Sequence, residues 1–148
     1  MITRNSIAVL LLILSLMSCD FFKSQDRPQG YPDYDFSLLE KVVYFDMETE
    51  EQLFIDDIST IETVKEYFQD KGNYFKDELR KFNGVKPNFS LTLISSMDTL
   101  VLRSYPLSGL KGRIEFDFTE KYDPNHPMKP RKVHRFYIKS ELLDLLGM

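Results

Sequence analysis

The chain has 148 residues, of which 43% are hydrophobic, 14% aromatic and 28% charged, and its formal net charge is −4. A chain of this length normally forms one domain. The acidic balance argues against nucleic acid as a partner, because phosphates bind proteins through basic surfaces. The single cysteine, Cys19, excludes a disulfide within the chain and a metal site built from several thiolates.

The first eighteen residues have the pattern of an export signal. Arg4 supplies the positive start, and residues 7–16 supply the apolar run that follows it. That run is shorter than the roughly twenty apolar residues that a membrane-spanning helix needs. We therefore expect residues 1–18 to be a signal peptide and not part of the fold.

A short motif closes this apolar run. Leu16-Met17-Ser18-Cys19 resembles the lipobox of bacterial lipoproteins, with Met17 in place of the usual small or β-branched residue. The resemblance implies cleavage after Ser18 and acyl chains on Cys19, where each buried methylene contributes about 0.8 kcal/mol to membrane binding. Asp20 resembles an inner-membrane retention signal of enteric bacteria, but the rule is not universal, so the inner and outer membranes both stay open. The alternative is an ordinary secretory signal with a chance cysteine.

Cleavage bounds the rest of the chain. Loss of Arg4 leaves 18 basic residues against 23 acidic ones, a net charge of −5. Acylated Cys19 leaves no thiol that could act as a nucleophile. Residues 19–36 carry breakers and polar residues without periodicity, which predicts a lipidated tether. Residues 37–148 are expected to form a single domain.

The first half of this domain predicts a hairpin and a helix. Residues 42–45 and 53–55 have the composition of strands, joined by a charged tip at residues 48–51. Ser59-x-x-Glu62 has the spacing of a capping box, which satisfies unpaired amides at a helix start. One apolar stripe at helical spacing then continues across Gly72-Asn73, and it predicts one kinked helix ending at Asn83-Gly84: Ile61, Val64, Phe68, Phe75, Leu79 and Phe82.

The second half predicts four strands and a short helix. Residues 89–93 and 100–102 are joined by a turn, and residues 133–138 form the last strand before a tail helix capped by Ser140. Residues 113–118 alternate most clearly, with inward Ile114, Phe116 and Phe118 and outward Arg113, Glu115 and Asp117.

The order of these elements, β-β-α-β-β-β-β-α, predicts the fold class. Strands joined by short turns favour antiparallel pairing, and one helix with one apolar stripe can cover one face. We expect an α+β domain with an antiparallel sheet of about six strands, one long helix on one face and a short C-terminal helix.

Catalytic patterns are missing from the sequence: it has no hydrolase nucleophile elbow, zinc-peptidase motif, phosphate loop or calcium loop. We interpret the two histidines, His126 and His134, as structural or exposed side chains, since one histidine without partners does not build a site. The acidic residues between positions 46 and 57 match no ligand spacing and are interpreted as a solvated hairpin tip. No catalytic residue, metal site or cofactor is assigned.

One basic concentration stands out, consisting of Lys129, Arg131, Lys132 and Arg135. One hypothesis is that this group binds acidic partners, such as lipid headgroups or an acidic protein face. In the other it protects an edge strand from unwanted pairing. Five tyrosines are candidates for exposed aromatic contacts: Tyr31, Tyr34, Tyr105, Tyr122 and Tyr137.

Together these features predict an envelope lipoprotein, anchored in a membrane through Cys19, that acts as a non-catalytic binding or accessory module for a protein partner. One version is an immunity protein that neutralises a toxin, because an acidic surface suits a basic enzyme target. The alternative is an enzyme with an unrecognised site of Asp, Glu and His residues.

Overall fold

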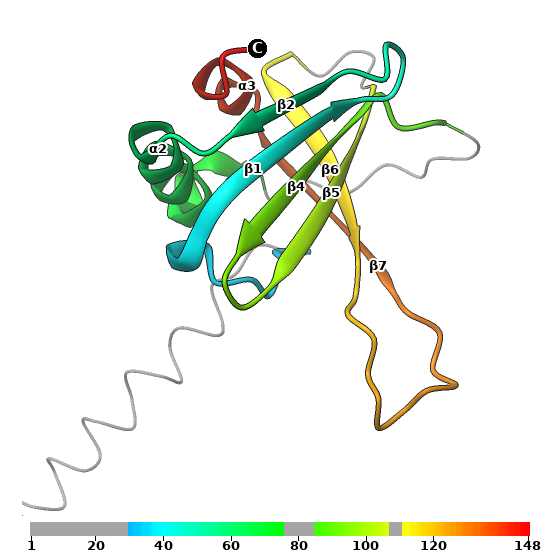
Figure 1. The fold of residues 1–148 in the computed structure, drawn as a ribbon. Coiled ribbons are helices and arrows are strands. Elements are labelled where there is room, and N and C mark those ends of the chain that lie inside the picture. Colours follow the sequence, from blue (N-terminus) through cyan, green and yellow to red (C-terminus); the bar gives the residue numbers. More distant parts are fainter. Residues whose placement is uncertain (1–29, 76–84, 107–110) are drawn as a thin grey trace, which may run out of the picture.

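A computed structural model of the chain describes residues 30–75, 85–106 and 111–148 (Figure 1). The expected signal peptide, the lipobox with Cys19 and most of the expected tether lie outside these residues. The predicted helix positions Leu79 and Phe82 lie outside them as well.

The described residues build one seven-stranded sheet in which every neighbouring pair is antiparallel. Its strand order is β2-β1-β4-β5-β6-β7-β3. The strands are β1 (Leu39–Asp46), β2 (Gln52–Ile55), β3 (Tyr74–Phe75), β4 (Phe89–Ser95), β5 (Thr99–Tyr105), β6 (Arg113–Thr119) and β7 (Val133–Lys139). The α+β antiparallel fold is thus confirmed, with one strand more than expected.

Two helices lie together on one side of the sheet (Figure 1): α2 (Ile58–Gln69) and the shorter α3 (Glu141–Leu145). Two single 3-10 turns, η1 (Phe36–Leu38) and η2 (Lys71–Asn73), flank β1 and β3. The helices contribute the apolar positions of their inner faces to the core: Ile61, Val64, Phe68, Leu142 and Leu146.

The core lies between these helices and one face of the sheet. Phe116 and Phe68 are both fully buried, as the periodicity predicts. The Phe116 ring contacts Phe89 edge-on at 6.0 Å and Phe136 at 5.7 Å, while Phe68 stacks on Phe36 at 4.8 Å between ring centroids. Period-two alternation therefore identified the buried face of β6 correctly.

The one long helix is confirmed, but its predicted continuation through a kink at Gly72-Asn73 is wrong, because α2 ends at Gln69. Side chains that follow it in the sequence bind its last carbonyl groups: Asn73 Nδ2 donates to Tyr67 O at 3.0 Å, and Tyr74 Oη donates to Phe68 O at 2.8 Å. Phe75 then lies in β3, opposite Tyr137 of β7. These local bonds and the tertiary pairing with β7 override a helical apolar spacing that happens to continue across the break.

The predicted capping box is also wrong. The N-cap of α2 is Asp57, whose carboxylate accepts the Thr60 amide N–H at 2.9 Å. Ser59 lies inside the helix and donates its hydroxyl to the same carboxylate at 2.8 Å. An aspartate two residues earlier therefore performs the capping that the sequence assigned to Ser59.

The second face of β6 differs from the prediction, since Glu115 and Asp117 are buried and not outward in solvent. Asp117 accepts Arg103 Nε and Tyr105 Oη from the neighbouring strand β5, each at 2.7 Å. Glu115 lies between Tyr105 of β5 and Tyr137 of β7 in the register of the sheet. The acidic residues that alternate with apolar ones along β6 therefore form a polar face that is buried.

Packing begins earlier than the expected domain boundary. Tyr34 and Phe36, which the sequence places in the tether, belong to the core, and Tyr31 packs against it. The Tyr31 hydroxyl donates to Phe68 O at 3.1 Å. Residues 31–36 therefore act as part of the domain.

Candidate binding surface

A long connection between β6 and β7, residues 120–132, projects from the sheet, and we call it the arm (Figure 1). The arm and the β1–β2 turn lie at opposite ends of the strands, because β1 and β6 run in opposite directions. Every arm residue from Lys121 to Lys132 is exposed except Asp123, which is half-buried. The arm is therefore a solvent-facing appendage on a packed sheet.

The foot of the arm is fixed by contacts to the sheet. The Glu120 amide donates to Lys132 O at 2.9 Å, which extends the β6–β7 ladder by one step. His134 Nε2 donates to Glu120 Oε1 at 2.8 Å, and its ring stacks on Phe118 at 5.3 Å. Lys121 forms an ion pair with Asp98 of the β4–β5 turn.

Hydrogen bonds within the arm engage its two acidic side chains. His126 Nδ1 lies 2.9 Å from Asp123 Oδ2, and the Asn125 amide donates to Asp123 Oδ1 at 2.9 Å. The bond from His126 holds the pKa of Asp123 below its usual value. The bond from His134 likewise lowers the pKa of Glu120. Both carboxylates are therefore hydrogen-bonded to histidines, Asp123 inside the arm and Glu120 to His134 of β7 at the foot of the arm.

The predicted basic patch divides between this arm and the sheet. Lys129, Arg131 and Lys132 are exposed on the second leg of the arm, and none of them forms an ion pair with another described residue. Arg135 lies on β7, opposite Asp117 in register. Edge protection would require the cations to lie on the strand itself, so this hypothesis does not explain the first three.

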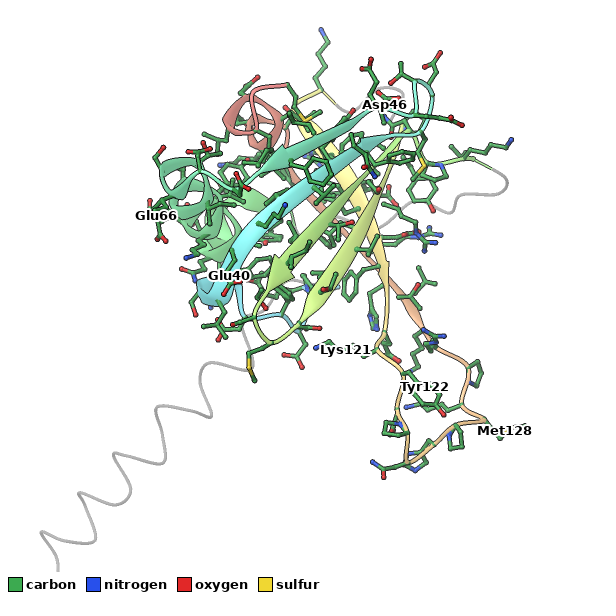
Figure 2. The ribbon with its side chains drawn as sticks, in the orientation of Figure 1. Glu40, Asp46, Glu66, Lys121, Tyr122 and Met128 are labelled. Carbon is green, nitrogen blue, oxygen red and sulfur yellow. The ribbon has the colours of Figure 1, made fainter. Side chains whose placement is uncertain are left out.

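Two apolar or aromatic side chains of the arm are exposed as well. Met128 exposes 93% of its surface and Tyr122 exposes 57%. Figure 2 labels both on the arm, with Met128 at its far end. Lys121 and Met128 are not among the binding residues predicted from the sequence, although the number of residues between the two predicted strands already indicates a long loop.

The other candidate tyrosines do not form an exposed set. Tyr34 and Tyr137 are buried, and Tyr31 and Tyr105 are half-buried. Tyr122 alone among the five is exposed. Aromatic recognition by this group therefore reduces to one residue of the arm.

The two histidines do not lie together in an enclosed pocket. His126 and His134 each meet one carboxylate, but both pairs lie on the arm or at its foot. An open cleft of about 410 Å³ lies elsewhere, between β2, the start of α2 and α3, and neither histidine lines it. Among the described residues, no group of three or more His, Cys, Asp and Glu side chains could hold a metal ion.

The acidic residues of the β1–β2 turn have the structure expected of a solvated tip. Glu48, Glu50 and Glu51 are exposed, and the Asp46 carboxylate accepts the amides of Glu48 and Thr49 at 2.8 and 2.9 Å. These backbone bonds, that of Thr49 first, lower the pKa of Asp46. Figure 2 shows Asp46 at the end of the sheet that lies away from the arm.

Comparison of the chain with protein-family models, curated protein sequences and solved structures finds no match. Within the described ranges, no helix has both the length and the apolar character needed to cross a membrane.

Proposed function

We propose that the protein is an envelope lipoprotein that acts as a non-catalytic binding module. Acyl chains on Cys19 hold it to a membrane, and the arm holds an acidic partner. The observation that supports this proposal best is the arm, which presents Lys129, Arg131 and Lys132 to solvent while its own acidic side chains are engaged internally.

The arrangement of the titratable groups favours binding over catalysis. A general base needs a substrate-sized space beside it, with a reacting proton within hydrogen-bond reach. His126 is 70% exposed on the arm, and His134 stacks on Phe118 at the foot of the arm. Both histidines orient arm carboxylates, which is a structural role.

The anchor is tested by labelling cells with a fatty acid analogue. The wild-type chain should incorporate the label, and Cys19→Ala should abolish incorporation because no other thiol is present. Ser18→Ala is the matched control, since it keeps a small residue before the cysteine and should leave labelling intact. Equal labelling of the wild type and Cys19→Ala would rule the anchor out.

The partner is tested by a photoreactive amino acid at position 128 in living cells. Because Met128 is exposed at the far end of the arm, cross-linking should give an adduct with a lipid or with a protein. The double variant Arg131→Glu with Lys132→Glu should reduce that adduct, while Lys71→Glu with Lys86→Glu, exposed cations outside the arm, should not. A complete lack of adducts would refute the arm as the binding surface.

A further inference from the structure

The described chain begins beside the foot of the arm. Gly30 has a φ of +82°, and a Cβ atom placed on it would lie 1.8 Å from the carbonyl oxygen of Arg135. The backbone of Gly30 therefore lies directly against β7, three residues after the arm ends. Only glycine fits this contact. It follows that the tether enters the domain next to the arm.

The lengths of these two segments allow them to reach one surface together. Cys19 and Gly30 are 11 residues apart in the sequence, which span at most about 40 Å when fully extended. Each leg of the arm has about six residues and can extend at most about 20 Å from the sheet. A membrane that holds the acyl chains on Cys19 is thus within reach of Met128.

The charges favour the same orientation. The cations Lys129, Arg131 and Lys132 lie on the arm, while Glu48 and Glu50 lie in the β1–β2 turn, at the opposite end of the strands. With the arm toward an anionic membrane, these acidic side chains point away from it. Each Lys or Arg near such a surface contributes about fivefold to binding.

The arm as a whole has the composition of a membrane-interface segment. Tyr122 and Met128 expose most of their surfaces beside the cations. Tyrosine prefers the headgroup level of a bilayer, and apolar side chains gain free energy by entering the acyl boundary. An acidic protein would account for the cations, whereas a membrane also accounts for the entry of the tether beside the arm.

We propose that the arm is a second membrane contact, which docks on anionic lipid headgroups of the same membrane that holds the lipid anchor. This inference rests on the proposed function, because it requires acylation of Cys19. The cations bind phosphate groups of the lipids, and Met128 and Tyr122 enter the interface. Docking through two points fixes the orientation of the domain, with the β1–β2 turn facing away from the bilayer.

The test uses the lipidated full-length product in vesicles of phosphatidylcholine with or without phosphatidylglycerol. Once Cys19 is acylated, Met128→Cys introduces the one free thiol, which is labelled with an environment-sensitive fluorophore. A lipid-borne quencher should quench this label on anionic vesicles and not on neutral ones. The labelled control is Ile58→Cys, because Ile58 is 80% exposed at the start of α2, outside the arm.

Charge reversal then tests the cations. Arg131→Glu with Lys132→Glu should lower the equilibrium constant for docking at least about 20-fold, from about fivefold per lost cation. The matched pair Lys71→Glu with Lys86→Glu should leave quenching unchanged, although it alters the net charge equally. Quenching should also fall as salt is raised, since salt screens the headgroup field.

Two results would overturn the inference. Label at position 128 that stays in water on anionic vesicles, while the protein still floats with them, would refute membrane docking and leave the anchored binding module standing. Protein adducts without lipid adducts in cells would have the same meaning. Absence of acyl groups on Cys19, seen by mass spectrometry, would instead remove the premise and refute both proposals.

Discussion

The β1–β2 turn and the arm are both hairpin connections of one sheet, yet they differ in charge, length and internal bonding. The turn is short and acidic, and backbone amides of Glu48 and Thr49 bind the Asp46 carboxylate. The arm is long and carries four cations, and histidine side chains bind its two carboxylates. A connection that only joins strands needs few residues and satisfies itself through its backbone. The greater length of the arm therefore supports the binding role proposed for it.

The largest expected effect concerns the core on which both connections depend. Phe116→Ala should lower the free energy of unfolding by about 3–5 kcal/mol, because it removes a fully buried ring from the centre of β6. Phe54→Ala, which truncates a ring that is 56% exposed on β2, should cost less than about 1 kcal/mol. Chemical denaturation measures both. Equal losses would contradict the burial of the Phe116 ring and the exposure of the Phe54 ring.

A smaller effect should follow from the buried polar face of the strand that leads into the arm. Asp117→Asn removes the charge that Arg103 and Tyr105 bind, and it should cost about 1–3 kcal/mol. The Arg103 side chain is 39% exposed, so water replaces part of what it loses. Thr119→Ala, an exposed position on the same strand, is the control and should cost little. A stable Asp117→Asn protein would mean that this pair contributes no net stability.

Excision of the far end of the arm should separate function from folding. Replacement of residues 124–130 by a two-residue turn should change the free energy of unfolding by less than about 1 kcal/mol, because these residues are exposed and loop length has a weak effect on stability. Because the excised segment contains position 128, the fluorophore is moved to Tyr122→Cys, and the excision should reduce the quenching of this label on anionic vesicles by removing Met128 and Lys129. Global unfolding of this variant would show instead that the arm supports the sheet.

The smallest expected effect is on the titration of the carboxylates. The folded pKa of Glu120 is lowered, so its pairing stabilises the fold above the unfolded pKa of about 4.3, and this stabilisation is lost as the pH falls through the folded pKa. His134→Phe should raise the pKa of Glu120 toward its ordinary value while retaining a ring on Phe118. The Asp46 pKa, set by backbone amides of the distant turn, should not move. Carbon-detected NMR titration can follow both groups, and an unmoved Glu120 would contradict the assigned cause.

Short-range pattern and tertiary context explain which expectations succeeded. Phe116 and Phe68 were predictable because their strand and helix bury one face at a regular period. The end of α2 was not, since Phe75 lies seven residues after Phe68 and keeps the helical phase. What ends the helix is the local bond from Asn73 to Tyr67 O together with the pairing of Phe75 with Tyr137, a residue far away in the sequence.

The surface shows the same limit. The cations Lys129, Arg131 and Lys132 were identified from composition alone, but their place on a projecting arm depends on where β6 and β7 end. The burial of Glu115 and Asp117 could not be read from alternation, because a charged residue facing away from the apolar core has the same spacing whether it is covered or solvated. Only the neighbouring strand, with Arg103 and Tyr105, shows that Asp117 is covered.

The alternating direction of the strands has an electrical consequence. The strands β1 and β6 end at opposite ends of the sheet. The connections that follow them therefore place acidic and basic side chains at opposite ends of the domain. The two connections of this acidic chain therefore differ in sign, with an excess of cations on the arm and of carboxylates on the β1–β2 turn. Near an anionic surface the field would turn the molecule before any side chain touches a lipid. Salt screens this field beyond about 8 Å at physiological ionic strength, so it acts on the arm only where the tether, which spans at most about 40 Å, leaves the arm close to the bilayer.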